Sequence, residues 1–375
     1  MSAEARLQAV RAELKARFIE REQVVDGALL AVLCRQHLLL LGPPGTAKSM
    51  LAKDLCLRVG GKTYFEWLLT KFTTPEEIFG PVSLEALEAG RYERVIDGKL
   101  PCADVAFLDE VFKANSAILN ALLTVLNERR FHQGADVMPV PLLTLVAASN
   151  ELPDEEELAA LYDRFLLRFT VGYIQHDYKF ARLLSMAPEP EGEPTRLTPA
   201  ELAELQAKLQ QIAVPDGVLR EIIDIRKKLN TEGVVASDRR YRQAVQVLRA
   251  AAVLEGRAEV QTGDLRWLEH VLWSDPEDQP KVAQVLGQAL SGLESEAKKL
   301  LFQAKEVHAY AYQRWPSAHE KQRALLEALS KIRELRSRLL AMLDQARDRG
   351  RDTTALQEIA DEVSALEQHL LGNKV

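Results

Sequence analysis

The sequence of 375 residues is poor in features that would point to a secreted or membrane protein. It contains only three cysteines, Cys34, Cys56 and Cys102, and their odd number and spacing fit neither a disulfide framework nor a metal site. Its most apolar runs, 38–41 and 142–148, are far too short to cross a bilayer. The charged, amphipathic N-terminal stretch does not have the pattern of a signal peptide. We therefore expect a cytoplasmic protein with buried, reduced thiols.

The sequence also lacks any long run of lysine or arginine, and its net charge is −7. Binding to a phosphate backbone relies on clustered positive charge, so the composition argues against a protein whose main surface grips nucleic acid. The length exceeds that of one ordinary domain, and a hydrophobic content of 47% supports a substantial core. Two or three folded parts are the expectation.

Short apolar segments alternate with helical patterns in the first half of the chain. Three segments, His37–Leu41, Val105–Leu108 and Leu142–Ala148, have the length and composition of buried strands. The segment 117–127 carries its apolar residues on one helical stripe, and residues 1 to about 35 also read as helices. This alternation predicts an α/β fold with a parallel sheet that is covered on both faces.

Almost every segment after a Pro- and Glu-rich stretch at 188–194 is helical in pattern. Thr198 followed by Pro199 predicts the start of the first helix of a second domain. From 281 to 375, apolar residues recur at alternating steps of four and three, which predicts an antiparallel helical hairpin or a three-helix coiled coil. The apolar stripe is explained by packing alone, whereas a docking role would fall to the charged faces or the tip.

A glycine-rich loop follows the first predicted strand and precedes a helical segment. The loop consists of Gly42, Pro43, Pro44, Gly45, Thr46, Ala47, Lys48 and Ser49. The backbone N–H groups of such a loop cradle phosphates, Lys48 would bridge the β- and γ-phosphates of ATP, and Ser49 would place its hydroxyl on Mg²⁺. Ala47 departs from the pattern, which has glycine there, but one methyl group is small enough for binding to survive.

Polar residues that suit ATP hydrolysis come at the ends of the following strands. Asp109 and Glu110 end the second predicted strand, where Asp109 would bind Mg²⁺ and Glu110 would orient and polarise the attacking water. Asn150 ends the next strand and would help to hold that water. Arg164 would act on the γ-phosphate of a neighbouring subunit. Arg239, at the start of a helix in the second domain, could also reach nucleotide.

Two arginine assignments leave alternatives. Arg240 directly follows Arg239, and a helix start allows either side chain to face the nucleotide, with Arg239 favoured. Arg168 is a second candidate for contact with a neighbouring subunit, or else a structural ion pair.

The order of these motifs resembles that of AAA+ ATPases: Walker A at 42–49, Walker B at 105–110, sensor 1 at Asn150, an arginine finger at Arg164 and sensor 2 at Arg239. Longer stretches are similar to the MoxR family and, within it, to the RavA subgroup. They are 71–81, 90–94, 122–129, 148–153 and 235–240. The resemblance extends from about residue 5 to residue 275.

The resemblance implies an αβα nucleotide-binding domain at 1–190, an all-α lid domain at 195–275 and a C-terminal helical coiled-coil domain at 281–375. Within the first domain it implies a helix-2 insertion at 72–100 and a pre-sensor-1 hairpin at 129–141. It further implies a hexameric ring with Arg164 supplied in trans, and a protein partner that often carries a von Willebrand A domain. The C-terminal segment departs from RavA, which has a partly β insertion there.

Three functions account for these features to different degrees. A chaperone-like ATPase that remodels or matures a partner complex explains the full hydrolytic set together with the insertions. A ring scaffold that is locked by nucleotide and recruits partners through its helical tail is the alternative. A nucleic-acid-dependent ATPase would need a basic surface interleaved with aromatic residues, which the sequence does not show.

Overall fold

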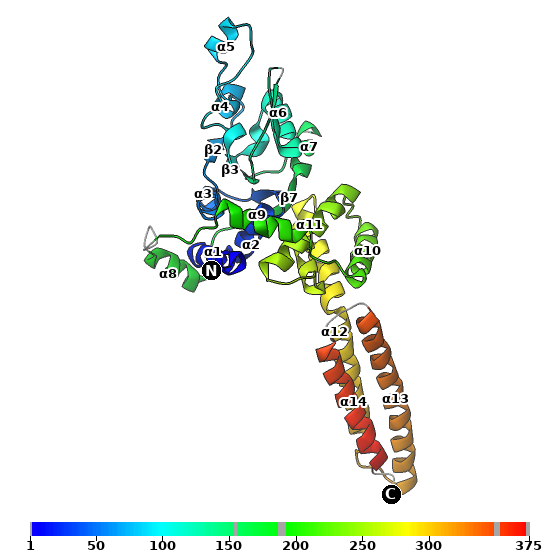
Figure 1. The fold of residues 1–375 in the computed structure, drawn as a ribbon. Coiled ribbons are helices and arrows are strands. Elements are labelled where there is room, and N and C mark those ends of the chain that lie inside the picture. Colours follow the sequence, from blue (N-terminus) through cyan, green and yellow to red (C-terminus); the bar gives the residue numbers. More distant parts are fainter. Residues whose placement is uncertain (1, 135, 154–155, 187–192, 349–352, 373–375) are drawn as a thin grey trace. The chain divides into compact units, whose positions relative to one another are not determined.

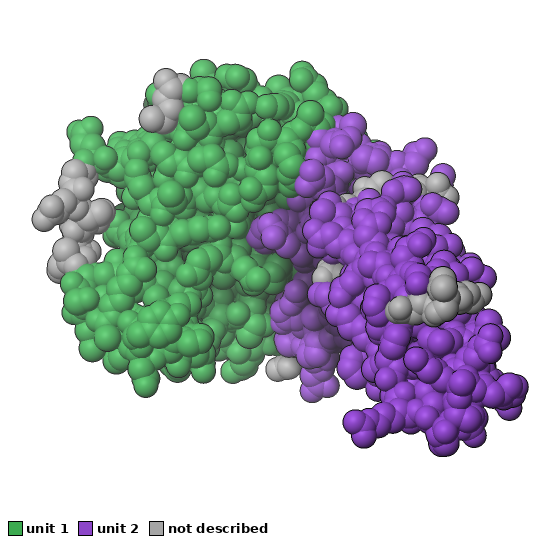
Figure 2. All heavy atoms as spheres, turned by 90° about the horizontal axis from the view of Figure 1, so that it is seen from below, with its two compact units in different colours: residues 1–212, 236–258, 270–272 green, residues 213–235, 259–269, 273–375 purple. Residues whose placement is uncertain are grey.

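The computed structural model describes residues 2–134, 136–153, 156–186, 193–348 and 353–372 (Figure 1). The chain divides into two compact units (Figure 2). Unit 1 comprises residues 1–212, 236–258 and 270–272, and unit 2 comprises residues 213–235, 259–269 and 273–375.

A five-stranded parallel sheet forms the centre of unit 1, with the strand order β2-β3-β6-β1-β7. The strands are β1 (His37–Leu41), β2 (Tyr64–Leu68), β3 (Val105–Asp109), β6 (Thr144–Ser149) and β7 (Phe165–Thr170). Every residue of β1 is buried, as expected of a central strand in a sheet that is covered on both faces. The predicted α/β fold and its three predicted strands are confirmed, whereas β2 and β7 were not foreseen.

Ten helices and two short 3₁₀ turns accompany this sheet in the described part of unit 1. They are α1 (Ala3–Arg17), α2 (Glu22–Leu33), α3 (Lys48–Arg58), α4 (Pro75–Phe79), α5 (Leu84–Glu88), α6 (Ser116–Glu128), α7 (Glu156–Arg164), α8 (Asp177–Ser185), α9 (Pro199–Leu209), α11 (Asp238–Leu254), η1 (Leu100–Cys102) and η2 (Val111–Lys113). Local capping explains several starts. Thr198 and Glu201 form a capping box at α9, and the Ser237 side chain accepts the Arg240 N–H at α11.

A two-stranded antiparallel hairpin lies within the segment 129–141. It consists of β4 (Arg130–Gln133) and β5 (Asp136–Pro139). Its turn packs on the segment that holds α4 and α5, because the Gln133 side chain donates to the Arg94 carbonyl over 3.1 Å. Gly134 has a φ of +64°, and a Cβ there would lie 2.4 Å from the Tyr92 carbonyl oxygen. Only glycine fits this close approach.

Three long helices form the C-terminal part of unit 2. They are α12 (Gln279–Ala311), α13 (Ala318–Asp348) and α14 (Thr354–Gly372), preceded in the chain by α10 (Asp216–Thr231), η3 (Thr262–His270) and η4 (Pro276–Asp278). The three helices share one apolar core, to which Ala304, Ile332 and Val363 contribute. The periodic apolar stripes therefore form a three-helix bundle rather than a two-helix hairpin.

The predicted domain boundaries stay predictions. The compact units group α9 and α11 with the sheet, and α10 with the C-terminal helices. Residues 187–192 and 349–352, which include most of the predicted Pro- and Glu-rich linker and a predicted helix break, lie outside the described residues. Among the residues that the structure describes, no helix is long and apolar enough to cross a membrane.

Candidate functional site

The glycine-rich loop leaves the carboxyl end of β1 and leads directly into α3. Gly42 donates its N–H to the Ser149 carbonyl of the adjacent strand over 3.0 Å. Its φ is +147°, and a Cβ would lie 2.0 Å from the Val171 carbonyl oxygen, so the loop begins at a position that only glycine can occupy. The loop and the first turn of α3 present unsatisfied N–H groups, which favour an anion.

Ala47 is the last residue before α3 and adopts the left-handed conformation, with a φ of +62°. The motif has glycine at this position, and the conformation explains why: left-handed backbone is costly for a residue with a Cβ. Ala47 nevertheless adopts this conformation, which glycine would adopt at a lower cost.

Lys48 is buried at the start of α3, and its ammonium group donates to the carbonyls of Gly42 and Pro43 over 2.7 and 2.9 Å. Burial lowers its pKa, while the carboxylates of Asp109 and Glu110 act in the opposite direction. The ammonium group is thus held within the loop and near both acids, where an incoming phosphate can replace the carbonyls as its partner.

The acidic pair lies at the carboxyl end of β3, and Asn150 follows the adjacent β6. Glu110 has a φ of +52°, and its carboxylate accepts from the Asn150 amide over 2.9 Å and pairs with Lys113 over 3.3 Å. Asp109 accepts the Glu110 N–H over 3.0 Å. The structure thus brings the predicted water-activating acid and the predicted sensor 1 amide into direct contact.

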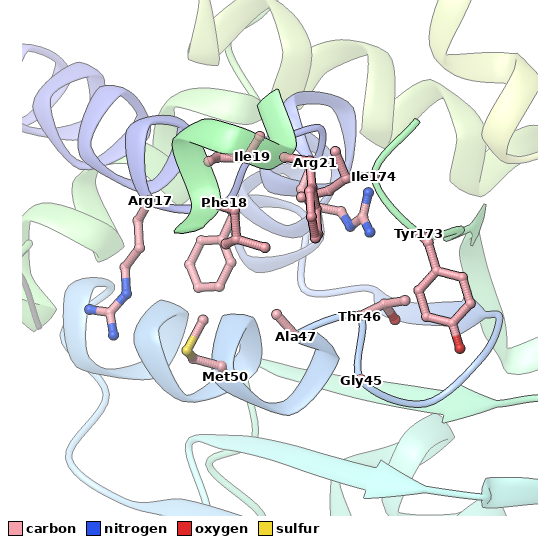
Figure 3. A pocket seen from close by; sticks show the side chains of 12 residues that line it. Arg17, Phe18, Ile19, Arg21, Gly45, Thr46, Ala47, Met50, Tyr173 and Ile174 are labelled. Atoms are coloured by element: carbon pink, nitrogen blue, oxygen red, sulfur yellow. The ribbon is translucent and has the colours of Figure 1, made fainter. Parts of the chain in front are cut away.

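A cavity of about 310 Å³ opens beside the loop, within unit 1. Figure 3 shows Ala47 and Thr46 at its floor, with Phe18 and Met50 on one side and Tyr173 on the other. It is lined by Arg17, Phe18, Ile19, Arg21, Gly45, Thr46, Ala47, Met50, Tyr173, Ile174, Phe180 and Leu183. A mostly apolar cavity next to a phosphate loop suits a flat aromatic base. Gly45, Thr46 and Ala47 belong to the predicted phosphate loop, whereas sequence reasoning missed the other lining residues, which follow no motif.

One wall of this cavity is α8, which has no buried residue of its own. Glu20 holds the start of this helix, because its carboxylate accepts the N–H groups of Gln175 and His176 over 2.8 and 3.2 Å, and His176 Nδ1 lies 2.6 Å away. These contacts, led by the Gln175 N–H, lower the pKa of Glu20 to about 2. The Glu20 carboxylate therefore holds the start of the helix that borders the cavity, and Arg182 of the same helix also donates to the Ala16 carbonyl over 3.2 Å.

The candidate arginines lie at the opposite edge of the sheet. Arg164 directly precedes β7, whose first residue Phe165 pairs with His37 at the start of β1. Arg239 donates to the Asn127 side chain over 3.2 Å, at the end of α6, where the neighbouring Leu126 carbonyl meets the His37 ring over 3.2 Å. Both arginines therefore lie at the amino edge of the sheet, while the loop, Glu110 and Asn150 lie at its carboxyl edge.

The two arginines that were left as alternatives are both buried. Arg240 is 2% exposed, and its guanidinium donates to the carbonyls of Phe165 and Leu166 over 2.9 and 3.0 Å. Arg168 is 1% exposed and donates to the carbonyls of Phe165 and Tyr162 over 3.1 and 3.0 Å. Arg239, by contrast, is exposed. The alternatives thus divide into one exposed arginine and two that are buried among carbonyls of their own chain.

The donor set at the carboxyl edge suits a hard cation. Ser49 supplies a hydroxyl and Asp109 a carboxylate, which are the oxygen ligands that Mg²⁺ prefers. The described residues contain no cluster of three or more His, Cys, Asp or Glu side chains that could hold a metal by itself.

A parallel sheet in the order β2-β3-β6-β1-β7, with a phosphate loop after β1, an acidic pair after β3 and an amide after β6, defines an AAA+ P-loop ATPase. The comparisons with known proteins agree. The model of the MoxR domain of MoxR–vWA–β-propeller ternary systems matches residues 5–211, and the model of an AAA lid domain matches residues 217–286.

Two uncharacterised proteins of Methanocaldococcus jannaschii are similar to this chain. One is 41% identical over 282 residues, which are 75% of this chain and 73% of the relative. The other is 34% identical over 372 residues, 98% of this chain and 99% of the relative, so the similarity includes the C-terminal helices. Chaperone MoxR1 of Mycobacterium tuberculosis is 29% identical over 216 residues, 56% of this chain and 55% of that protein.

Among solved structures, a candidate ATPase from Cytophaga hutchinsonii has the same fold, with a TM-score of 0.61 at 18% identity over 77% of this chain and 94% of that chain. The chain belongs to the MoxR family of AAA+ ATPases. The RavA subgroup stays a prediction.

Proposed function

We propose that the protein hydrolyses Mg-ATP in a ring of identical subunits and uses this cycle to remodel or mature a partner protein complex. The observation that carries the proposal is the contact between Glu110 and Asn150 at the mouth of the phosphate loop. This pair, together with Lys48, is the set of groups that hydrolysis of a bound γ-phosphate requires.

In the proposed reaction, Glu110 accepts a proton from a water molecule while the water oxygen attacks the γ-phosphorus. ADP departs with the bridging oxygen. The Asn150 amide holds Glu110 and helps to position the water, while Lys48 and the loop N–H groups stabilise the phosphate charge. A Mg²⁺ ion at Ser49 and Asp109 would neutralise charge on the β- and γ-phosphate oxygens.

The placement of Arg164 supports a composite site between subunits. β1 has five residues, so the two edges of the sheet are about 16 Å apart. An arginine at the amino edge therefore cannot reach the phosphates of its own chain without unfolding β7. A ring with head-to-tail interfaces presents that edge to the next subunit's nucleotide. We therefore assign Arg164 to the neighbouring subunit's γ-phosphate.

The same geometry argues that Arg239 acts in trans as well. It lies at the amino edge with Arg164, and the two guanidinium groups are close enough for Arg239 to contribute to the lowered pKa of Arg164, after burial. Two like charges that converge on one surface favour an anion between them. We propose that both arginines contact one nucleotide, which is bound by the adjacent subunit.

A protein partner with a von Willebrand A domain is the proposed object of the cycle. Support comes from the matched model, which describes MoxR domains of ternary systems with vWA and β-propeller proteins, and from the chaperone relative. The hairpin at 130–139 and the segment 72–100, which pack together, are the proposed contact elements. A hexamer is the proposed ring size.

The first test measures the ATPase rate against protein concentration, together with the mass of the assembly with and without ATP. Under the proposal, the rate per subunit of the wild type rises as the ring assembles. The Glu110→Gln variant assembles and binds ATP but does not turn it over. A stable ring without turnover under any condition, including with partner added, would favour the nucleotide-locked scaffold.

Mixed rings test the trans assignment. A donor subunit carries Glu110→Gln and keeps its arginines, and an acceptor subunit carries Arg164→Ala and keeps its hydrolytic residues. Each is inactive alone, but at a one-to-one ratio about a quarter of the interfaces join an intact site to an intact arginine. Adding Arg239→Ala to the donor should lower the recovered rate more than adding it to the acceptor. The reverse order would assign Arg239 to its own subunit's nucleotide.

A further inference from the structure

The segment that carries Arg164 is held by two buried arginines. It runs from Tyr162 to Leu166 and joins α7 directly to β7 without a loop. Its backbone carbonyls at the end of the helix have no partners within the helix, so they need donors from elsewhere. Arg168 and Arg240 supply these donors, and neither is among the hydrolytic residues.

Arg240 binds this segment at several points. Besides the carbonyls of Phe165 and Leu166, it donates to the Asp163 carbonyl over 3.4 Å and to Asp163 Oδ1 over 3.1 Å. Its Nε donates to the Val271 carbonyl. The Arg240 side chain is 3% exposed, and its bonds to the carbonyls of Phe165, Leu166 and Val271 form away from solvent, where they restrict the segment most strongly.

Arg168 binds the same segment as well, and both arginines donate to the Phe165 carbonyl. Its guanidinium lies 3.8 Å from the centre of the Tyr162 ring and bonds the Tyr162 carbonyl. Burial, and next the nearby Arg240, lowers the pKa of Arg168 to about 9. Two buried guanidinium groups at one place are costly, and such a cost is typical of functional sites rather than of plain cores.

Asp163 connects this arrangement to Arg164. Its Oδ1 is fixed by Arg240, and its Oδ2 lies 3.7 Å from Arg164 NH1. The Arg164 side chain is only 20% exposed, and its Nε is buried without a hydrogen-bond partner among the described residues. Arg164 is therefore a partly desolvated cation with an unpaired Nε and with the Asp163 carboxylate beside it.

We propose that Asp163 and Arg240 are positioning residues for Arg164: Arg240 locks the Asp163 carboxylate, and that carboxylate aims Arg164 at the nucleotide of the adjacent subunit. The inference rests on the proposed function, because it assumes that Arg164 acts across a subunit interface. Arg168 supports the arrangement by fixing the backbone on either side of the pair.

The experiment uses the mixed rings of donor and acceptor subunits in full-length protein. Asp163→Asn removes the charge at a side chain that is 44% exposed, so the fold should tolerate it. Placed in the donor, it should lower the recovered kcat about 10- to 100-fold, because displacement of a catalytic group by about 1 Å costs that much. In the acceptor, which has no Arg164 to aim, the loss should be at least tenfold smaller.

Arg240→Lys in the donor is the second variant. It keeps the positive charge but loses the planar fork that serves several acceptors at once, so the same donor-specific loss is expected. The Tm of each variant and its affinity for ATP show whether it folds and binds normally. Asp344→Asn, the same chemical change at an exposed position of α13, is the matched control and should leave the recovered rate as it was.

The outcomes separate the inference from the function on which it rests. If unmodified donor and acceptor subunits recover no activity when mixed, the trans assignment of Arg164 fails. If they recover activity, and Asp163→Asn lowers it equally in both placements or not at all, Asp163 is structural and the inference fails. If Asp163→Asn in the donor raises the recovered rate, Asp163 keeps Arg164 away from the nucleotide. That result also overturns the proposal.

Discussion

Replacing Ala47 by glycine should stabilise unit 1, because Ala47 occupies left-handed backbone with a φ of +62°. That conformation costs an L-residue about 1–2 kcal/mol. Glycine removes this cost but adds about 0.4–1 kcal/mol of unfolded-state entropy. The net gain is about 0.5–1 kcal/mol, which for a folded part of this size corresponds to a rise in Tm of about 1–4 °C.

Thermal unfolding without nucleotide, followed by circular dichroism, measures this effect. Gly45 provides the matched control in the same loop, since its φ is +77° and a Cβ there would meet no atom within 4 Å. Gly45→Ala should therefore lower the Tm by a similar amount through its backbone alone. If Ala47→Gly fails to raise the Tm while Gly45→Ala lowers it, the assigned strain at Ala47 is wrong.

Three further perturbations have defined outcomes. Glu20→Ala removes the carboxylate that holds α8 at the cavity, and should accelerate release of a fluorescent ADP analogue roughly three- to tenfold in stopped flow; unchanged release would separate α8 from nucleotide exchange. Burial lowers the pKa of His270 to about 4, so between pH 6.5 and 4 the unfolded chain binds a proton that the folded chain does not. Stability should then fall on acidification by up to about 1.4 kcal/mol per pH unit, and His270→Phe should flatten this slope in urea titrations. Leu335→Ala, at a site 1% exposed in the three-helix bundle, should cost about 2–5 kcal/mol of that bundle's stability without changing ATP affinity. A changed affinity would contradict the expectation that the core of the bundle and the ATP site are independent.

The parts of the fold that sequence predicted are those with strong local signals. β1 was recognisable because it is uniformly apolar and ends at glycine and proline, and α9 because Thr198 followed by Pro199 marks its start. β2 and β7 were missed because charged residues interrupt them, as Glu66 and Arg168 do. Arg168 is tolerated inside β7 only because carbonyls and the Tyr162 ring surround it. That environment exists only in the tertiary structure.

The candidate functional site also has a part that sequence motifs predicted and a part that they did not. The residues at the carboxyl edge follow a motif whose spacing is set by one loop and two strand ends, so Lys48, Glu110 and Asn150 could be proposed together. The cavity walls come from α3, α8 and the two segments that follow α1 and β7, each contributing apolar side chains with no pattern of their own. No periodicity identifies such residues, because what they share is a position in space rather than a place in a motif.

The arginines show how topology can favour one of two functions that motif order leaves open. Motif order alone allows Arg239 to serve the nucleotide of its own subunit or of the next. In a parallel sheet, every strand end that carries a hydrolytic group lies at one edge, and every residue that precedes a strand lies at the other. Arg164 lies at the amino edge because it directly precedes β7. Arg239 lies at the same edge because it bonds the Asn127 side chain. Under the proposed ring, a subunit that keeps its acid and its arginines on opposite edges contributes to two sites, so turnover should depend on assembly.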